Sequence, residues 1–97
     1  MYTASKEQIE KWKAEHGEIS RITVAGKACY LKQPSRKALG YASVAGKSNP
    51  LKFNEVLLND CWLAGDEEIK TNDTLFLSIS SKLAELIEVK EAELEKL

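Results

Sequence analysis

Residues 19–34 read ISRITVAGKACYLKQP, and this stretch decides the fold class. β-Branched residues crowd its first half, and residues 29–31 form an apolar run in its second half. Between the two halves lie residues 25–27 (AGK), a turn in which the glycine can adopt a positive φ. The pattern predicts a β-hairpin over residues 19–33, which is ended by Pro34 because proline has no N–H to donate to a sheet.

A short helix is expected before the hairpin. Ser5 to Gln8 fits a capping box, with Ser5 as the N-cap, and Gly17 suits the C-terminal end of the helix. Ile9 and Trp12 lie three residues apart on one face, so the apolar stripe is narrow. We therefore expect this helix to be peripheral, either loosely tied to the core or free to pack on a partner.

Two helices are expected to follow the hairpin. Ser35 is a good N-cap for a helix that runs to about residue 45 and ends at Gly46. Asn49 and Pro50 are a strong start signal for the next helix, which we interpret as the central core helix. Gly65 is expected to stop that helix.

A third helix is predicted after a polar, acidic loop over residues 66–72. Asn72 or Asp73 would cap it, and it would start at Thr74 and run almost to residue 97. Apolar residues recur along it at helical spacing, namely Phe76, Ile79, Leu83, Leu86, Ile87 and Leu94. The pattern predicts a long amphipathic helix whose last turns meet solvent or another chain.

The chain has 97 residues, which is room for one domain. We expect a single α+β domain over residues 1–97, with a peripheral helix in 1–17, a β-hairpin in 18–34 and three helices packed on the hairpin in 35–97. No stretch has the roughly 20 apolar residues that a membrane span needs. The N-terminal segment also lacks the apolar core of a secretory signal, so we expect a soluble, cytoplasmic protein without a membrane partner.

Little in the sequence indicates catalysis. Cys29 and Cys61 lie in apolar runs and are interpreted as buried thiols, with a disulfide or one reactive thiol as the alternatives. Two cysteines and the single histidine, His16, cannot supply four ligands to a structural zinc ion. His16 itself suits a helix end. We expect no catalytic residue, no metal and no cofactor.

Two segments imitate ligand sites. Residues 40–48 (GYASVAGKS) look like a phosphate-binding loop, but they have one residue too many between the glycines and follow a predicted helix instead of a strand. A helix that ends at Gly46 is the favoured interpretation. The acidic residues of 66–73 could bind a divalent cation, yet they lack the ligand spacing of a calcium loop, so a solvated loop is favoured.

The net charge of −1 conceals an asymmetry. Residues 19–54 hold seven basic and no acidic residues, whereas residues 55–97 hold eleven acidic and four basic ones. Three interpretations stay open: phosphate binding by the basic region, association of copies or docking on a charged partner, and neutralisation within the fold. Nucleic-acid binding is disfavoured, because the basic residues do not share one helix face and the acidic half would repel a polyanion.

Two stretches, ACYLKQPSRKALGYA at residues 28–42 and NEVLLNDCWLAGDEEI at residues 54–69, precede a charged segment that ends ELIEVKEAELEKL. Their order resembles small bacteriophage tail assembly proteins of the tail-assembly-chaperone type. Members of that family resemble a strand ending in Pro-[Ser/Thr]-Arg before a helix, and later a helix with an Asn-x-Cys-like segment before a Gly-Asp loop. The matching residues are 30–42 and 54–66, with looser similarity onward.

The resemblance implies a prophage-type, non-enzymatic role in virion assembly in the cytoplasm of a bacterial host. Such proteins bind the tape-measure protein and help recruit tail-tube subunits. No catalytic residues carry over, and Pro34, Arg36 and Cys61 are expected to be structural. The alternative function is a regulatory or adaptor protein, or a weak nucleic-acid binder through residues 19–54.

The candidate partner-binding residues are Trp12, Arg36, Lys37 and Phe76. Tryptophan is enriched at interfaces, so Trp12→Ala is expected to weaken partner binding more than folding. Core packing is favoured for Trp62.

Overall fold

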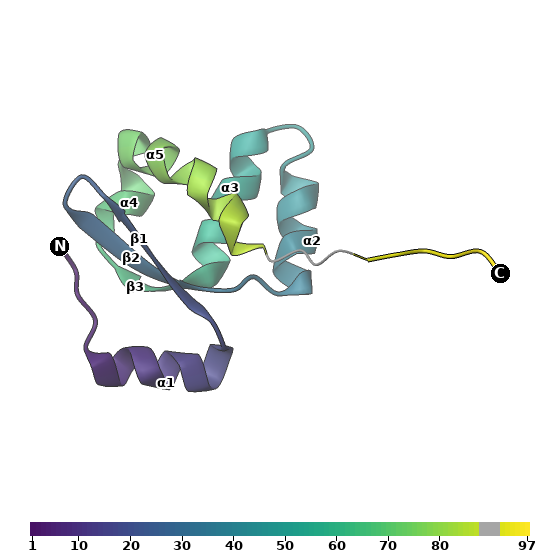
Figure 1. Ribbon diagram of the computed structural model, residues 1–97. Helices are drawn as coiled ribbons and strands as arrows, with labels where there is room; N and C mark the ends of the chain where they lie inside the picture. Colours follow the sequence, from purple (N-terminus) through teal and green to yellow (C-terminus); the bar gives the residue numbers. More distant parts are fainter. Residues whose placement is uncertain (88–91) are drawn as a thin grey trace.

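The computed structural model describes residues 1–87 and 92–97 and confirms the predicted α+β class. A three-stranded antiparallel sheet of order β1-β2-β3 separates one helix from the remaining helices (Figure 1). The elements, in chain order, are α1 (Lys6–His16), β1 (Ile19–Val24), β2 (Lys27–Lys32), α2 (Arg36–Ala45), α3 (Pro50–Cys61), β3 (Trp62–Gly65), α4 (Glu68–Thr71), α5 (Asp73–Leu83) and the 3₁₀ turn η1 (Ala84–Leu86).

The predicted hairpin is present, with a tighter turn than expected. Val24 pairs directly with Lys27, so only Ala25 and Gly26 lie between the strands. Both turn residues have positive φ, 46° and 75°. That combination is the primed turn whose twist matches that of the paired strands. Lys27, which was expected in the turn, is the first residue of β2.

The third strand was not predicted. The core helix was expected to continue to Gly65, but it ends at Cys61, and residues 62–65 pair with β2 instead. This pairing makes β2 the central strand and satisfies its second row of backbone groups. A β-carbon at position 65 would lie 2.6 Å from the Cα of Cys29, so the close approach of the two strands requires glycine there.

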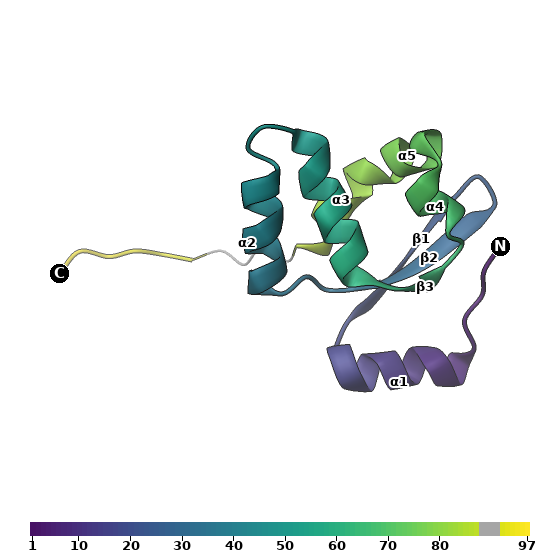
Figure 2. The ribbon, with the colours of Figure 1, turned by 180° about the vertical axis from the view of Figure 1, so that it is seen from behind.

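Each face of β2 belongs to a different core. Cys29 and Leu31 face the larger core, which is built with α3, α4, α5 and η1. Tyr30 points the other way and packs in a smaller cluster with Trp12 of α1 and with Ala4. The molecule therefore has three layers, with α1 alone on one face of the sheet, as the view from behind also shows (Figure 2).

All three later helices were expected to pack on the hairpin, but α2 packs mainly on α3, and its Leu39 reaches the larger core. It lies against α3 at the side of the molecule (Figures 1 and 2). The small buried residues Ala38 and Ala42 form its inner face and allow the two helices to approach closely. The outer face of α2 is left exposed.

The predicted helix starts are confirmed. The side chains of Ser5, Ser35 and Asn49 each accept a hydrogen bond from a backbone N–H in the first turn of their helix. Asn72, and not Asp73, caps α5, because its side chain accepts from the Leu75 N–H at 3.1 Å. Each cap satisfies a backbone donor that would otherwise lack a partner inside the helix.

The last helix is shorter than predicted. Helix α5 ends at Leu83, and the chain tightens into η1, which buries Leu86 in the larger core. Residues 92–97 are not helical and extend away from the body (Figure 1). The part of the predicted helix at residues 88–91 lies outside the described residues.

The segment predicted as an acidic loop contains a short helix. Glu68–Thr71 forms the short helix α4, and its Ile69 is fully buried in the larger core. Within the described residues, no helix combines the length and the apolar character that crossing a bilayer requires.

Candidate functional site

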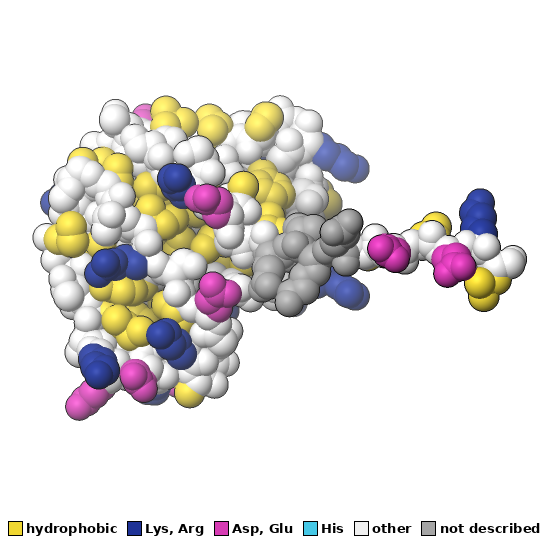
Figure 3. Space-filling view, viewed as in Figure 1, with side chains coloured by type: hydrophobic (Ala, Val, Ile, Leu, Met, Phe, Trp, Pro, Cys, Tyr) yellow, Lys and Arg dark blue, Asp and Glu magenta, His cyan; other side chains and the backbone are white. Residues whose placement is uncertain are grey.

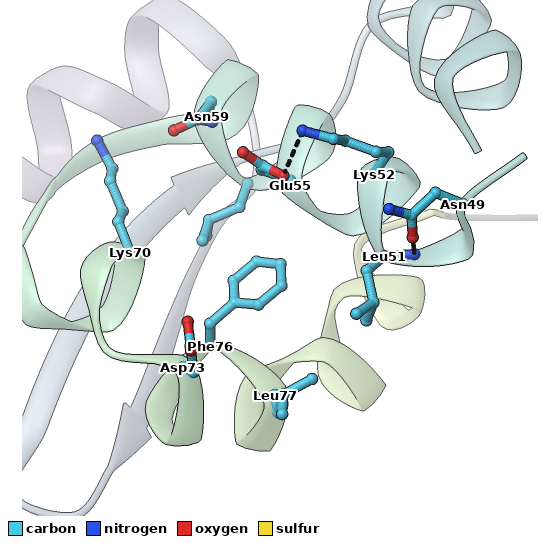
Figure 4. A pocket seen from close by; sticks show the side chains of 10 residues that line it. Asn49, Leu51, Lys52, Glu55, Asn59, Lys70, Asp73, Phe76 and Leu77 are labelled. Atoms are coloured by element: carbon cyan, nitrogen blue, oxygen red, sulfur yellow. Dashed lines mark hydrogen bonds and ion pairs between the residues drawn. The ribbon is translucent and has the colours of Figure 1, made fainter.

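A groove of about 490 Å³ lies between α3 and α5. Its base includes the buried Leu58, and the half-buried Phe76 stands between the two helices (Figure 4). Leu51 and Leu77 lie at one end, where their side chains are 46% and 53% exposed. Large apolar side chains that gather in a hollow and stay in contact with water are typical of a binding surface.

The helices place these side chains by ordinary periodicity. In α5, the buried Ile79 and Leu83 point into the larger core, and Phe76 lies one turn before them on the same side. Leu77 follows Phe76 and is rotated by about 100° away from it, so it reaches the groove mouth and not the core.

The polar groups at the Leu51 end of the groove are already engaged in local structure. The Lys52 ammonium lies 3.3 Å from the Glu55 carboxylate, and the Asn49 side chain accepts from the Leu51 N–H at 3.1 Å (Figure 4). Both interactions join residues of the first turns of α3. They hold the end of that helix, and neither presents an unsatisfied group to a ligand.

At the opposite end, Lys70 of α4 has two partners. Its Nζ lies 4.2 Å from the centre of the Trp62 ring and 3.6 Å from the Glu67 carboxylate. A cation over an aromatic face is stabilised by the ring quadrupole. The remaining polar residues at this end, Asn59 and Asp73, complete a rim that carries both signs of charge. The groove therefore offers an apolar centre with a mixed polar border and no paired nucleophile and base.

The four residues predicted to bind a partner do not come together. Trp12 is only 8% exposed, with its ring centre 5.6 Å from that of Tyr30, on the opposite side of the sheet from the larger core. Arg36 and Lys37 are exposed in the first turn of α2. Only Phe76 lines the groove.

The expectation of a loosely tied N-terminal helix is wrong. Trp12 anchors α1 in the smaller cluster, and the Tyr30 hydroxyl accepts from the Ala4 N–H at 3.2 Å. The sequence could not show this, because the partner of Trp12 comes from the central strand and one apolar stripe does not reveal what it will cover.

The acidic residues of 66–73 point to separate partners and not to a common centre. The Asp66 carboxylate accepts the N–H groups of Tyr2 and Ala28, both at 2.9 Å. Glu68 pairs with Lys27 at 3.3 Å. Among the described residues, no three metal-binding side chains of the His, Cys, Asp and Glu types gather at one place.

The segment that imitates a phosphate loop is helical through residue 45 and then forms a turn. Residues 36–45 form α2, and the Gly46 N–H donates to the Ala42 carbonyl at 2.9 Å. The predicted helix end at Gly46 is confirmed. Within α2 the backbone amides point along the helix axis and bond to preceding carbonyls, so they do not form a cradle.

The two cysteines are buried and free, as the sequence predicts for structural thiols. Burial raises the pKa of Cys29 from 9.0 to about 11 and has the same effect on the pKa of Cys61. A thiol with such a pKa is protonated at neutral pH and is a poor nucleophile. Neither cysteine is suited to covalent catalysis.

Sequence reasoning missed Leu51 and Leu77, the exposed leucines of the groove. The sequence held a signal for Leu77. It lies outside the apolar stripe of Phe76, Ile79 and Leu83, and a leucine outside the stripe that faces the core is expected to be exposed. Leu51 follows Pro50 in a first helical turn and carries no such signal. The structure alone places the two residues at the same end of one groove.

Comparison of the chain with protein-family models, with curated proteins and with solved structures found no match. The resemblance to phage tail assembly proteins therefore stays a prediction.

Proposed function

We propose that this chain is a non-enzymatic binding protein whose groove between α3 and α5 takes an apolar segment of a protein partner. The observation that carries the proposal is the pair of exposed leucines, Leu51 and Leu77, at the end of a groove with Phe76 at its centre. Apolar side chains of a partner helix, spaced three or four residues apart, fit a groove of this kind.

The chemistry of the border supports a helical segment of protein as the occupant. The rim carries cations and carboxylates together, namely Lys52, Glu55, Lys70 and Asp73. A polyanion such as nucleic acid would meet carboxylates within the groove itself. An amphipathic helix instead places apolar residues at the centre and polar residues of either sign at the edges.

The phage resemblance makes the proposal concrete, with the tape-measure protein or a tail-tube subunit as the partner. A long helical protein that awaits assembly exposes apolar stripes, and a small protein with an apolar groove can cover them during assembly. The role requires no chemistry. It agrees with a groove in which Lys52, Glu55 and Lys70 are tied into local contacts.

The first experiment is a binding titration by calorimetry. If genes for a tail protein and a long tape-measure protein flank the gene for this chain, their purified products or fragments are the probes. Leu77→Asp is expected to weaken binding by roughly tenfold or more, because it places a charge in the apolar end of the groove. Ala14→Asp changes an exposed apolar residue on α1, outside the groove, and serves as the control.

The outcomes separate the two parts of the proposal. Equal binding by the wild type and Leu77→Asp would rule out the groove as the binding site. Absence of binding to any tail component would reject the phage role.

A further inference from the structure

Ion pairs among the described residues neutralise only part of the charge asymmetry of the sequence. Of the seven basic residues in 19–54, Lys27 pairs with Glu68 and Lys52 with Glu55. In the part of the chain that the structure describes, the other five make no ion pair. Three of those five lie on α2 or directly after it, and Lys and Arg side chains project from this edge of the molecule (Figure 3).

The outer face of α2, defined here as Lys37, Gly40, Tyr41, Val44 and Lys47, is also apolar at its centre. Tyr41 is 62% and Val44 69% exposed, although both are large and neither has a role in the packing of α2 on α3. A cation lies at each end of the face. No described element covers it.

Gly40 has no reason within the fold to be glycine. A β-carbon there would meet nothing within 4 Å, and glycine inside a helix costs about 1 kcal/mol relative to alanine. Gly40 lies one helical turn from both Lys37 and Val44, and its missing side chain instead allows another backbone to approach the helix closely. This feature fits a contact between chains.

The chain carries a segment complementary to this face. Residues 92–97 (AELEKL) project from the body (Figures 1 and 2). Leu94 and Leu97 are almost wholly exposed, and Glu93 and Glu95 are the sequence neighbours of Leu94. Leu94 would meet Tyr41 and Val44, and the carboxylates of Glu93 and Glu95 would outnumber the one cation of the segment, Lys96, at the lysines of the face. The segment is also long enough to cover the face, since six extended residues reach about 20 Å and the helical rise from Lys37 to Ala45, where α2 ends, is about 12 Å.

We propose that the outer face of α2 binds residues 92–97 of a second copy of this chain. The proposal is independent of the groove, because α2 contributes no residue to it. The contact joins two different surfaces, so a reciprocal exchange closes a dimer and a one-way contact builds a longer assembly. Opposite charges make the association weaker at high salt.

The test is the mass of the protein in solution, measured by light scattering at several protein and salt concentrations. We expect at least twice the 10.8 kDa of one chain at low salt and a fall toward 10.8 kDa at high salt. Val44→Glu and, separately, the double variant Leu94→Ser with Leu97→Ser are each expected to give the mass of one chain. All of these residues are exposed, so the variants should melt at the same temperature as the wild type diluted until it has the mass of one chain.

Two controls make the test specific. Leu77→Asp, which alters the groove, should leave the association intact, so a failure here and a failure of the groove proposal are distinguishable. The double variant Lys37→Glu with Lys47→Glu, and the double variant Glu93→Lys with Glu95→Lys, should each fail to associate alone. A mixture of the two double variants should associate, because opposite charges then meet again. A protein that stays at 10.8 kDa at every concentration would overturn the proposal. Association that survives Leu94→Ser with Leu97→Ser would also overturn it. A third contrary result would be a spin label on residue 97 that broadens the NMR signals of α2 in protein with the mass of one chain, because the tail would then bind its own helix.

Discussion

Asp66 and Ala28 exchange two hydrogen bonds, because the Asp66 N–H donates to the Ala28 carbonyl and the Ala28 N–H donates to the Asp66 carboxylate, each at 2.9 Å. The same carboxylate oxygen accepts the Tyr2 N–H. One side chain thus joins the end of β3, the start of β2 and the N-terminal segment.

This arrangement predicts a pH dependence of stability. The hydrogen bonds from Tyr2 and Ala28, with the nearby Lys27 and N-terminal charges, hold the pKa of Asp66 below its ordinary value of 3.8. The contribution of the ionised carboxylate is fully present above the unfolded pKa and is lost as the pH falls through the lowered folded pKa. Urea unfolding of the wild type at acidic pH should show this loss.

The variant Asp66→Asn removes the charge at nearly the same size, so it should flatten the acid side of the stability curve and lower stability at neutral pH. Asp60→Asn, at an exposed position of α3, should leave that slope in place. If the two variants give the same slope, the carboxylate of Asp66 has no such role.

Trp12→Ala should reduce the free energy of unfolding by about 3 kcal/mol, because it removes the largest side chain of the smaller cluster. This prediction replaces the expectation that the variant would affect binding more than folding. Tyr41→Ala is the matched control, since Tyr41 is exposed on α2 and its loss should change stability by less than about 0.5 kcal/mol. Equal effects in denaturant titrations would show that α1 is not anchored through Trp12.

Cys29 and Cys61 should resist alkylation at neutral pH until the protein unfolds, because both are inaccessible and protonated. Mass spectrometry after exposure to a thiol reagent measures the modified fraction. Ser43→Cys, at an exposed position of α2, should react at once and serves as the control. Fast labelling of the native thiols would contradict their burial.

The same thiols predict a loss of stability at alkaline pH. Because the folded pKa values are about 11 against 9.0, the unfolded state ionises first and stability should fall as the pH rises above 9.0.

Two glycine variants should change stability in opposite directions. Gly65→Ala forces a methyl group against the Cα of Cys29, 2.6 Å away, and should cost about 2 kcal/mol. Gly40→Ala enters open space in a helix and should stabilise the protein by about 1 kcal/mol. Thermal melts of both variants measure the difference. A neutral Gly65→Ala would mean that β3 does not lie so close to β2.

The site was less predictable than the helices that build it. Phe76 could be chosen from the sequence because it leads an apolar stripe, yet its neighbours in the groove come from α3, α4 and α5. A groove is a relation between elements, and local patterns describe only one element at a time. Trp12 illustrates the same point, since a lone aromatic on a polar helix reads equally as an anchor or as an interface residue.

The amino-acid sequence by itself determined the hairpin, the helix starts and the helix end at Gly46. Each depends on hydrogen bonds and dihedral angles within a few residues, as when the Ser35 side chain accepts the Ala38 N–H. The tertiary structure alone decided that residues 62–65 form a strand, that the last helix ends at Leu83 and that α2 faces outward. In the case of the strand, the free edge of β2 supplied hydrogen-bond partners from far along the chain, and that long-range pairing outweighed the local preference for helix.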